Sequence, residues 1–361
     1  MITARVKKQL SPGPNGSDVK LEIDLQTRQG ITALYGAAGS GKTMVLEAIA
    51  GFLTPDEGRI LLEDSILFDA ASGVNLPPQR RRCGWIPQEC SLFPHMTLQE
   101  NLAFAVTCLT SPRLPRLERH RRVKETLQRF GLKDAAGKRP HEVPREVRQR
   151  CSFARAVICM PRVVLLDEPA QRLDPPLKTE FYQLLRQIQK DFRIPVLLAT
   201  RDPEVCFELA EDLLVLHEGR VLQRGIPRAV FDQPATVEVA RILGTFNLLP
   251  ATITALDPVL KTSRLRVSDF DLMGPYFPGR LRGDNVTLCI RPDELTAMPR
   301  EGKPGPNQLA AQLVRFTERL SIVRLEFTGN ITVELARAEF ERYRHNKDWL
   351  IHFPPQYLRA L

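Results

Sequence analysis

The sequence predicts an α/β domain followed by a smaller all-β domain, and three observations support this fold class. A short apolar strand at residues 31–35 leads through a glycine-rich loop into an apolar helix. A second apolar run, at residues 163–166, ends in two acids, at the place where strands of open α/β sheets meet their ligands. After residue 258, apolar and polar residues alternate between Gly, Pro and Asn breaks, which is typical of short antiparallel strands.

The glycine-rich loop matches the G-x-x-x-x-G-K-[ST] pattern in the strand–loop–helix setting that supports it. Glycines let the backbone curl so that its N–H groups converge on phosphate oxygens at a helix N-terminus. We expect Lys42 to reach the β- and γ-phosphates and the Thr43 hydroxyl to bind Mg²⁺. The predicted nucleotide-binding residues are Gly36, Ala37, Ala38, Gly39, Ser40, Gly41, Lys42 and Thr43.

The acids at the end of the second strand, Asp167 and Glu168, complete this pattern. In a phosphoryl-transfer site an Asp in this position holds Mg²⁺. The adjacent Glu can polarise the attacking water as a general base. The loop and the acid pair together predict an α/β P-loop nucleotide-hydrolysing domain.

The segment between these motifs, "PPQRRRCGWIPQECSLFPHMTLQENLAF" at residues 77–104, resembles the ATP-binding subunits of ABC transporters. Gln88 stands where that family has its Q-loop glutamine, which implies contact with Mg²⁺ and with the attacking water. Asp174 matches the D-loop. The resemblance covers residues 1–235 and implies an ABC ATPase domain with a helical subdomain at about residues 90–160.

Within this family the chain is most similar to molybdate importer ATPases. The stretch "ILFDAASGVNLPPQRRRCGWIPQECSLFPH" at residues 66–95 combines phrases that are common there, although sulfate and iron importers share parts of it. The segment Leu92 to Leu102 is similar to the part of the family that faces the coupling helices of the membrane subunits.

The C-terminal third is expected to hold a linker and the start of a β-domain at residues 236–282, and the main part of that domain at residues 283–361. The alternating strands alone indicate a small antiparallel barrel for oligomerisation or ligand binding. The phrase "CIRPDEL" at Cys289 to Leu295 resembles the TOBE or Mop-like accessory domains of importer ATPases. Such domains mediate dimer contacts and in some members bind oxyanions.

The family's Leu-Ser-Gly-Gly-Gln signature is replaced throughout. Counting back from Asp167 without a gap places it at Val143, Pro144, Arg145, Glu146 and Val147. In the family these residues touch the γ-phosphate bound to a partner domain. Pro144 has neither a hydroxyl nor an N–H group, and Glu146 brings a negative charge towards a triphosphate. Arg145 or Arg148 offers a substitute cation.

A second replacement lies in "VLLATRDPEV", where the family's H-loop histidine becomes Arg201. An arginine can stabilise developing phosphoryl charge, as arginine fingers do. The first 34 residues contain no aromatic side chain to stack on adenine. The predicted catalytic residues are Glu168, Gln88 and Arg201. The predicted Mg²⁺ ligands are Thr43, Gln88 and Asp167.

These features predict the ATP-binding subunit of an ABC importer for molybdate or a related oxyanion, using ATP and Mg²⁺. The expected partners are membrane permease subunits, a second ATPase domain in a homodimer or heterodimer, and indirectly a periplasmic or extracellular binding protein. The alternative is an ATP-binding subunit with a degenerate site. Such a subunit hydrolyses slowly or not at all, and it regulates transport or pairs with an intact ATPase.

The net charge of +9 raises the question of a nucleic-acid partner. The densest basic run, Arg113 to Lys124, opens a helical pattern and fits a solvated helix face or a surface near a membrane. A DNA-associated ABC ATPase would need a coiled-coil or zinc insertion, and none is visible, so we expect no nucleic acid. No apolar run approaches the roughly 20 residues needed to cross a bilayer, so the expected location is the cytoplasmic face of the membrane.

Overall fold

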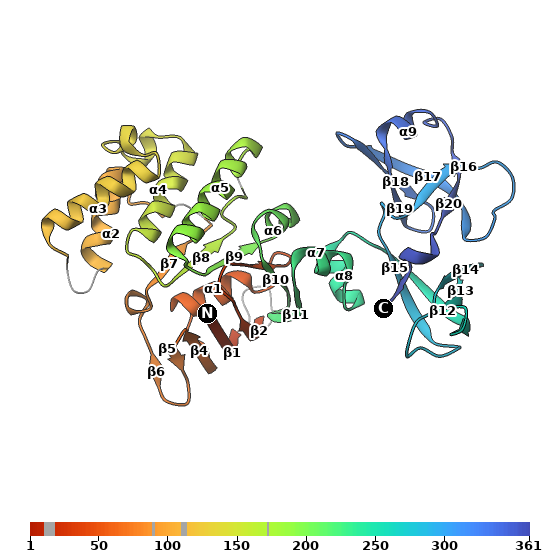
Figure 1. Ribbon diagram of the computed structural model, residues 1–361, viewed down its shortest axis with the longest axis horizontal. Coiled ribbons are helices and arrows are strands. Elements are labelled where there is room, and N and C mark those ends of the chain that lie inside the picture. The colour runs from red at the N-terminus through yellow and green to blue at the C-terminus, as the bar shows by residue number, and fades with distance from the viewer. Residues whose placement is uncertain (11–18, 89–90, 110–113, 172) are drawn as a thin grey trace. The chain divides into compact units, whose positions relative to one another are not determined.

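The computed structural model describes residues 1–10, 19–88, 91–109, 114–171 and 173–361, whose elements are shown in Figure 1. Arg113, the first residue of the basic run, lies outside these ranges. The chain divides into two compact units, Met1–Asp232 and Gln233–Leu361, and each is described by itself.

A sheet of six strands forms the centre of the first unit, in the order β11-β10-β3-β9-β8-β7. All neighbouring strands in it are parallel except β10 and β11. Every residue of β3, β8 and β9 is buried, as expected for inner strands of a parallel sheet covered by other elements. The strands are β3 (Ile31–Tyr35), β7 (Cys83–Ile86), β8 (Val163–Asp167), β9 (Val196–Thr200), β10 (Asp212–His217) and β11 (Arg220–Gly225).

Helices surround this sheet, and α2, α3 and α4 form the helical part expected at about residues 90–160. Helix α2 packs against both α3 and α4, and the three lie together at one end of the unit in Figure 1. The helices are α1 (Lys42–Ala50), α2 (Leu98–Leu109), α3 (Arg116–Arg129), α4 (Arg145–Val157), α5 (Pro175–Phe192), α6 (Pro203–Leu209) and α7 (Pro227–Asp232).

A second, antiparallel sheet of the first unit has the order β2-β1-β4-β5-β6. Apolar residues of its strands share a buried core with α1 and with one face of the parallel sheet. The helices α2–α4 belong to a separate buried cluster with the other face. The strands are β1 (Ile2–Leu10), β2 (Val19–Gln26), β4 (Glu57–Leu62), β5 (Ser65–Asp69) and β6 (Val74–Asn75).

The second unit is built mainly of strands, which confirms the expected small all-β domain. Its strands form two five-stranded sheets, β14-β13-β12-β15-β21 and β16-β20-β17-β18-β19. In the second of these, the edge strands β16 and β19 also come into contact, so the sheet curls towards a barrel. The strands are β12 (Asn247–Asp257), β13 (Thr262–Val267), β14 (Phe270–Pro275), β15 (Asn285–Ile290), β16 (Thr296–Pro299), β17 (Gln308–Glu318), β18 (Ile322–Phe327), β19 (Ile331–Ala336), β20 (Asp348–His352) and β21 (Arg359–Ala360).

Residues 236–282 are expected from the sequence to hold a linker and the start of the β-domain. They contain α8 (Val237–Leu243) and the strands β12, β13 and β14. Strand β12 pairs with β15 from Asn247↔Ile290 to Thr252↔Asn285, so most of this stretch is an integral part of the β-unit. A short helix, α9 (Arg337–Glu341), follows β19. No helix among the described residues has the length and apolar character that crossing a bilayer requires.

Candidate nucleotide-binding site

The phosphate loop lies between β3 and α1, where the sequence pattern placed it. Gly39 and Gly41 have φ angles of +79° and +100°, in the left-handed region that favours glycine. A Cβ on Gly36 would lie 2.3 Å from the carbonyl oxygen of Leu216, so a side chain cannot be accommodated there without movement. The glycines of the motif therefore serve both the turn and the close approach of neighbouring backbone.

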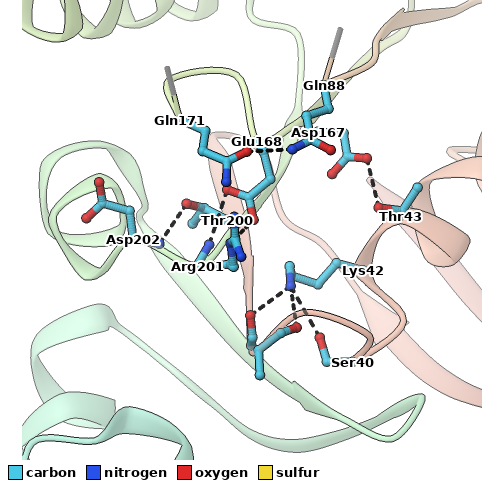
Figure 2. A network of polar contacts seen from close by, with 12 residues as sticks. Ser40, Lys42, Thr43, Gln88, Asp167, Glu168, Gln171, Thr200, Arg201 and Asp202 are labelled. Atoms are coloured by element: carbon cyan, nitrogen blue, oxygen red, sulfur yellow. Dashed lines mark hydrogen bonds and ion pairs between the residues drawn. The ribbon is translucent and has the colours of Figure 1, made fainter. Parts of the chain in front are cut away.

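Lys42 lies across this loop, as Figure 2 shows, and it is only 6% exposed. Its Nζ donates hydrogen bonds to the carbonyl oxygens of Gly36 at 2.7 Å and Ala37 at 2.8 Å. Burial lowers the pKa of Lys42, while the carboxylates of Glu168 and Asp167 act in the opposite direction. A buried ammonium held by neutral carbonyls is a favourable partner for an anionic phosphate.

Asp167 is the last residue of β8, and its Oδ2 accepts a hydrogen bond of 2.8 Å from the Thr43 hydroxyl. The Asp167 residue is 5% exposed. Burial raises its pKa, against the opposing effects of the Thr43 hydrogen bond and the Lys42 ammonium. The structure thus brings together two predicted Mg²⁺ ligands that are 124 residues apart in sequence.

Glu168 follows in a left-handed conformation with φ of +46°, which is uncommon for a residue with a side chain. Its side chain is 11% exposed and forms an ion pair of 3.5 Å with Nε of Arg201. The Arg201 backbone N–H also donates to Glu168 Oε2 at 3.4 Å. Burial raises the pKa of Glu168, and Lys42 and then Arg201 oppose this effect. Strain of this kind at a buried acid is typical of functional sites.

Gln88 reaches the same region from the loop after β7. Its Nε2 donates a hydrogen bond of 2.5 Å to Oε1 of Gln171, which leaves the Gln88 carbonyl oxygen for another ligand (Figure 2). The sequence analysis did not identify Gln171. The only signal was its place three residues after Glu168, and no pattern in the sequence predicts which side chain meets Gln88.

A cavity of about 440 Å³ joins these groups. It is lined by Ala38, Gly39, Ser40, Gly41, Lys42, Thr43, Met44, Gln88, Asp167, Glu168 and Arg201. The parallel pairing of β3 with β9 and of β9 with β8 explains this convergence, since the carboxyl ends of parallel strands share one edge of the sheet.

The donors in this cavity fit a bound Mg²⁺. Thr43 supplies a hydroxyl, Asp167 a carboxylate and Gln88 an amide carbonyl, and hard oxygen ligands of this kind suit Mg²⁺. The ion binds such sites through one or two protein groups together with substrate phosphates.

The five residues that the sequence analysis aligned with the signature do not line this cavity in the part of the chain that the structure describes. Val143 is buried in the core of the helical part, Pro144 is the N-cap of α4, and the remaining three form its first turn. Arg145 lines a separate space of about 20 Å³ together with Gln88 and Glu168. Asp174 is exposed as the N-cap of α5.

Comparison with known proteins agrees with this geometry. The model of the ABC transporter family matches residues 19–171. The chain is 34% identical to the spermidine/putrescine import ATP-binding protein PotA of Oleidesulfovibrio alaskensis over 76% of this chain and 71% of that protein. It is 32% identical to the molybdate/tungstate import ATP-binding protein WtpC of Pyrococcus horikoshii over 92% of this chain and 95% of that one.

Among solved structures, a dimeric ATP-binding cassette in a post-hydrolysis state bound to ADP and Pi shares the fold. Its TM-score is 0.55 at 24% identity, over 63% of this chain and 99% of that chain. The sequence motifs, the convergence of the loop with the acid pair, and these similarities lead to one assignment. The chain belongs to the ABC transporter family, among the ATP-binding subunits of its importers.

Proposed function

We propose that this chain binds MgATP in the cavity beside the phosphate loop, hydrolyses it, and couples this to import by a membrane permease. The observation that carries the proposal is the convergence of Lys42, Thr43, Asp167 and Glu168 on one cavity of about 440 Å³. Lys42 would exchange its carbonyl partners for phosphate oxygens. Thr43, Asp167 and Gln88 would hold Mg²⁺, which supplies charge neutralisation to the phosphates when bound.

In this proposal Glu168 accepts a proton from the attacking water. Its burial favours the role because a carboxylate with a raised pKa is a stronger base. Arg201 is the second residue that acts in ATP hydrolysis in this proposal. Its guanidinium lies beside Glu168 at the rim of the cavity, with the side chain 47% exposed, so it can turn from the carboxylate to a γ-phosphate.

Steady-state ATP hydrolysis by the purified full-length chain tests this assignment. We expect turnover that Glu168→Gln lowers by about 100-fold or more, since a general base contributes this much. Lys42→Ala should remove nucleotide binding in a calorimetric titration. Glu125→Gln, on the exposed surface of α3, is the matched control and should change neither quantity.

Binding without turnover in the unsubstituted chain would favour the alternative, a regulatory subunit or one that pairs with an intact ATPase. Unchanged nucleotide affinity in Lys42→Ala would contradict the assignment of the loop itself.

For the cargo we propose molybdate or a related oxyanion. The similarity to the molybdate/tungstate importer subunit supports this, at 32% identity over 92% of the chain. The similarity to PotA makes spermidine or putrescine the second candidate. Uptake of labelled molybdate and labelled spermidine by cells lacking this coding sequence separates the two, since only the true cargo should fail to accumulate.

We further propose that the permease contacts a surface that we call the aromatic groove. This cavity of about 310 Å³ is lined in part by Phe52, Trp85, Phe93 and Phe104. Phe52 and Phe104 are 60% and 42% exposed, which is unusual for large apolar side chains and typical of contact surfaces. Phe93 belongs to the segment 92–102 that resembles the permease-facing part of the family. The chain would then act as a peripheral subunit at the cytoplasmic face, paired with a second ATPase domain.

A further inference from the structure

Arg81 is the most deeply buried charged side chain of the first unit, at 1% exposed. Its Nη1 donates to the carbonyl oxygens of Ala48 at 2.6 Å and Ile49 at 3.0 Å. Its Nε donates to the Leu76 carbonyl at 2.7 Å, and its Nη2 to Asn75 Oδ1 at 2.8 Å. Within the described ranges of the chain, no carboxylate forms an ion pair with Arg81, so carbonyl and amide dipoles alone balance its charge.

The carbonyls of Ala48 and Ile49 belong to the last turn of α1, the helix that directly follows the phosphate loop. The last carbonyls of a helix lack partners within it and carry partial negative charge, so a guanidinium binds them well. The contact is tight, because a Cβ on Gly51 would lie 2.6 Å from Arg81 Nε. Helix α1 has only nine residues, so Lys42 and Thr43 lie within two turns of the carbonyls that hold Arg81.

The residues that follow Arg81 in the chain line the aromatic groove. They are Arg82 and Cys83, and Trp85 two residues further along β7. Phe52, which follows Gly51 at the end of α1, lies on the same groove with its ring centroid 6.0 Å from that of Trp85. One buried side chain therefore ties the end of the phosphate-loop helix to the strand that forms the groove.

We propose that Arg81 is a positioning residue that couples the aromatic groove to the phosphate loop. Nucleotide that engages Lys42 and Thr43 shifts α1, and Arg81 transmits this shift to β7 and the groove. By linkage, a partner seated in the groove changes nucleotide affinity by the same factor. The proposal rests on the proposed function in that it requires ATP to bind the phosphate loop.

Arginine is needed for this role because one planar fork satisfies acceptors from two segments at once, the end of α1 and residues 75–76. A lysine keeps the charge but offers one nitrogen, which cannot reach α1, Leu76 and Asn75 together. Arg81→Lys therefore weakens the connection between the segments while leaving a cation at the helix end.

The fluorescence of a tryptophan in the groove can report changes there. The chain has two tryptophans, Trp85 in the groove and Trp349 in the core of the second unit. In a full-length Trp349→Phe background, MgATP should change the emission of Trp85. Arg81→Lys in this background should reduce the change severalfold, since the contact of Phe52 with Trp85 remains, while the affinity for MgATP measured by calorimetry falls by only about fivefold.

Arg162→Lys is the matched control. Arg162 also donates several hydrogen bonds, to Ser65 Oγ at 2.7 Å and the Leu62 carbonyl at 3.3 Å in the β4–β5 hairpin, but it does not line the groove. The Arg162→Lys variant should keep the change in Trp85 emission on binding of MgATP. If Arg81→Lys does not fold, Asn75→Ala removes one acceptor of Arg81 at an exposed position and should reduce the response.

A full Trp85 response in Arg81→Lys, or in Asn75→Ala where the first variant does not fold, would overturn the proposal. So would MgATP binding by the unsubstituted background without any change in Trp85 emission. Absence of MgATP binding in calorimetry is a different result, because it overturns the proposed function instead.

Discussion

At the scale of single residues, the pair Glu168 and Arg201 distinguishes this site. The half-buried carboxylate of Glu168 forms an ion pair with Arg201, which stands where the resemblance predicts a histidine. This ion pair stabilises the charged form of Glu168. Arg201 can therefore act on the base as well as on the phosphate.

Arg201→Gln should move the acidic limb of the pH profile of ATP hydrolysis to higher pH. Burial already raises the pKa of Glu168, and Arg201 is one of the groups that lower it, so its removal raises that pKa further. Glu168 acts as a base only when ionised, so activity is lost as the pH falls through this pKa. In the variant this loss occurs at a higher pH than in the unsubstituted chain. We also expect turnover at neutral pH to fall about 100-fold, the effect of removing one charge-stabilising donor.

The measurement is kcat/KM for ATP between pH 5 and 9. Arg220→Gln, which removes a surface ion pair with Glu22, should leave the profile unchanged. An unshifted acidic limb in Arg201→Gln would mean that Arg201 does not act on Glu168.

At the scale of elements, the start of α4 holds the residues that the sequence analysis aligns with the family's signature. Pro144 is the N-cap and supplies no side-chain hydrogen bond, and the first turn carries Arg145 and Glu146, where the alignment predicts two glycines. This composition favours a stable helix start, because glycine costs about 1 kcal/mol within a helix. We expect the same residues to limit the close backbone approach that the resemblance implies towards a nucleotide on a partner domain.

Replacing residues 143–147 with Leu-Ser-Gly-Gly-Gln, together with Arg201→His, should raise the turnover of the purified protein. The same change should lower thermal stability slightly. Serine at the N-cap adds about 1 kcal/mol, and two glycines remove about 1 kcal/mol each. Hydrolysis assays and a thermal melt measure the two effects. An unchanged turnover would show that the native residues already supply what the family's set provides.

At the scale of the whole molecule, each unit has its own buried core. In the core of the second unit Trp349 packs against Phe327 and Phe340, and the exposed Tyr343 lies against its ring. All the residues of the candidate site belong to Met1–Asp232. Units with separate cores are expected to fold independently.

A chain ending at Asp232 should therefore fold and bind MgATP with a dissociation constant within about twofold of the full-length value, as distant and independent parts do. Circular dichroism melts and calorimetry provide the measurement, with Lys42→Ala in the short chain as the negative control. A short chain that is unfolded, or that has lost nucleotide affinity, would show that the second unit supports the site.

Much of the fold and of the site could be predicted from the sequence, because the strongest signals are local. The phosphate loop needs glycines at fixed spacing between a strand and a helix, and Asp167-Glu168 needs only to end an apolar strand. Gln88 and Arg201 were placed by resemblance to a family. The second unit was harder, since alternation indicates strands but not their partners, and the pairing of β12 with β15 was not foreseen.

Arg81 shows most clearly what local signals leave open. It stands between Arg80 and Arg82, both exposed, and nothing in this basic run indicates which guanidinium is buried. Its acceptors come from α1 and from residues 75–76. The most distant of them in sequence, Ala48, is 33 residues from Arg81. The contact between Gln88 and Gln171 likewise joins residues 83 apart.

The sequence by itself determined the residues on which the chemistry of this protein depends: a glycine-rich loop before a helix and an acid pair at a strand end. These depend on residue type and short-range spacing, which the chain encodes directly. Only the tertiary structure decided which groups meet, namely Glu168 with Arg201, Gln88 with Gln171, and Arg81 with the end of α1. The reason is that such contacts depend on strand order and helix packing, which bring distant residues together through the burial of the whole core.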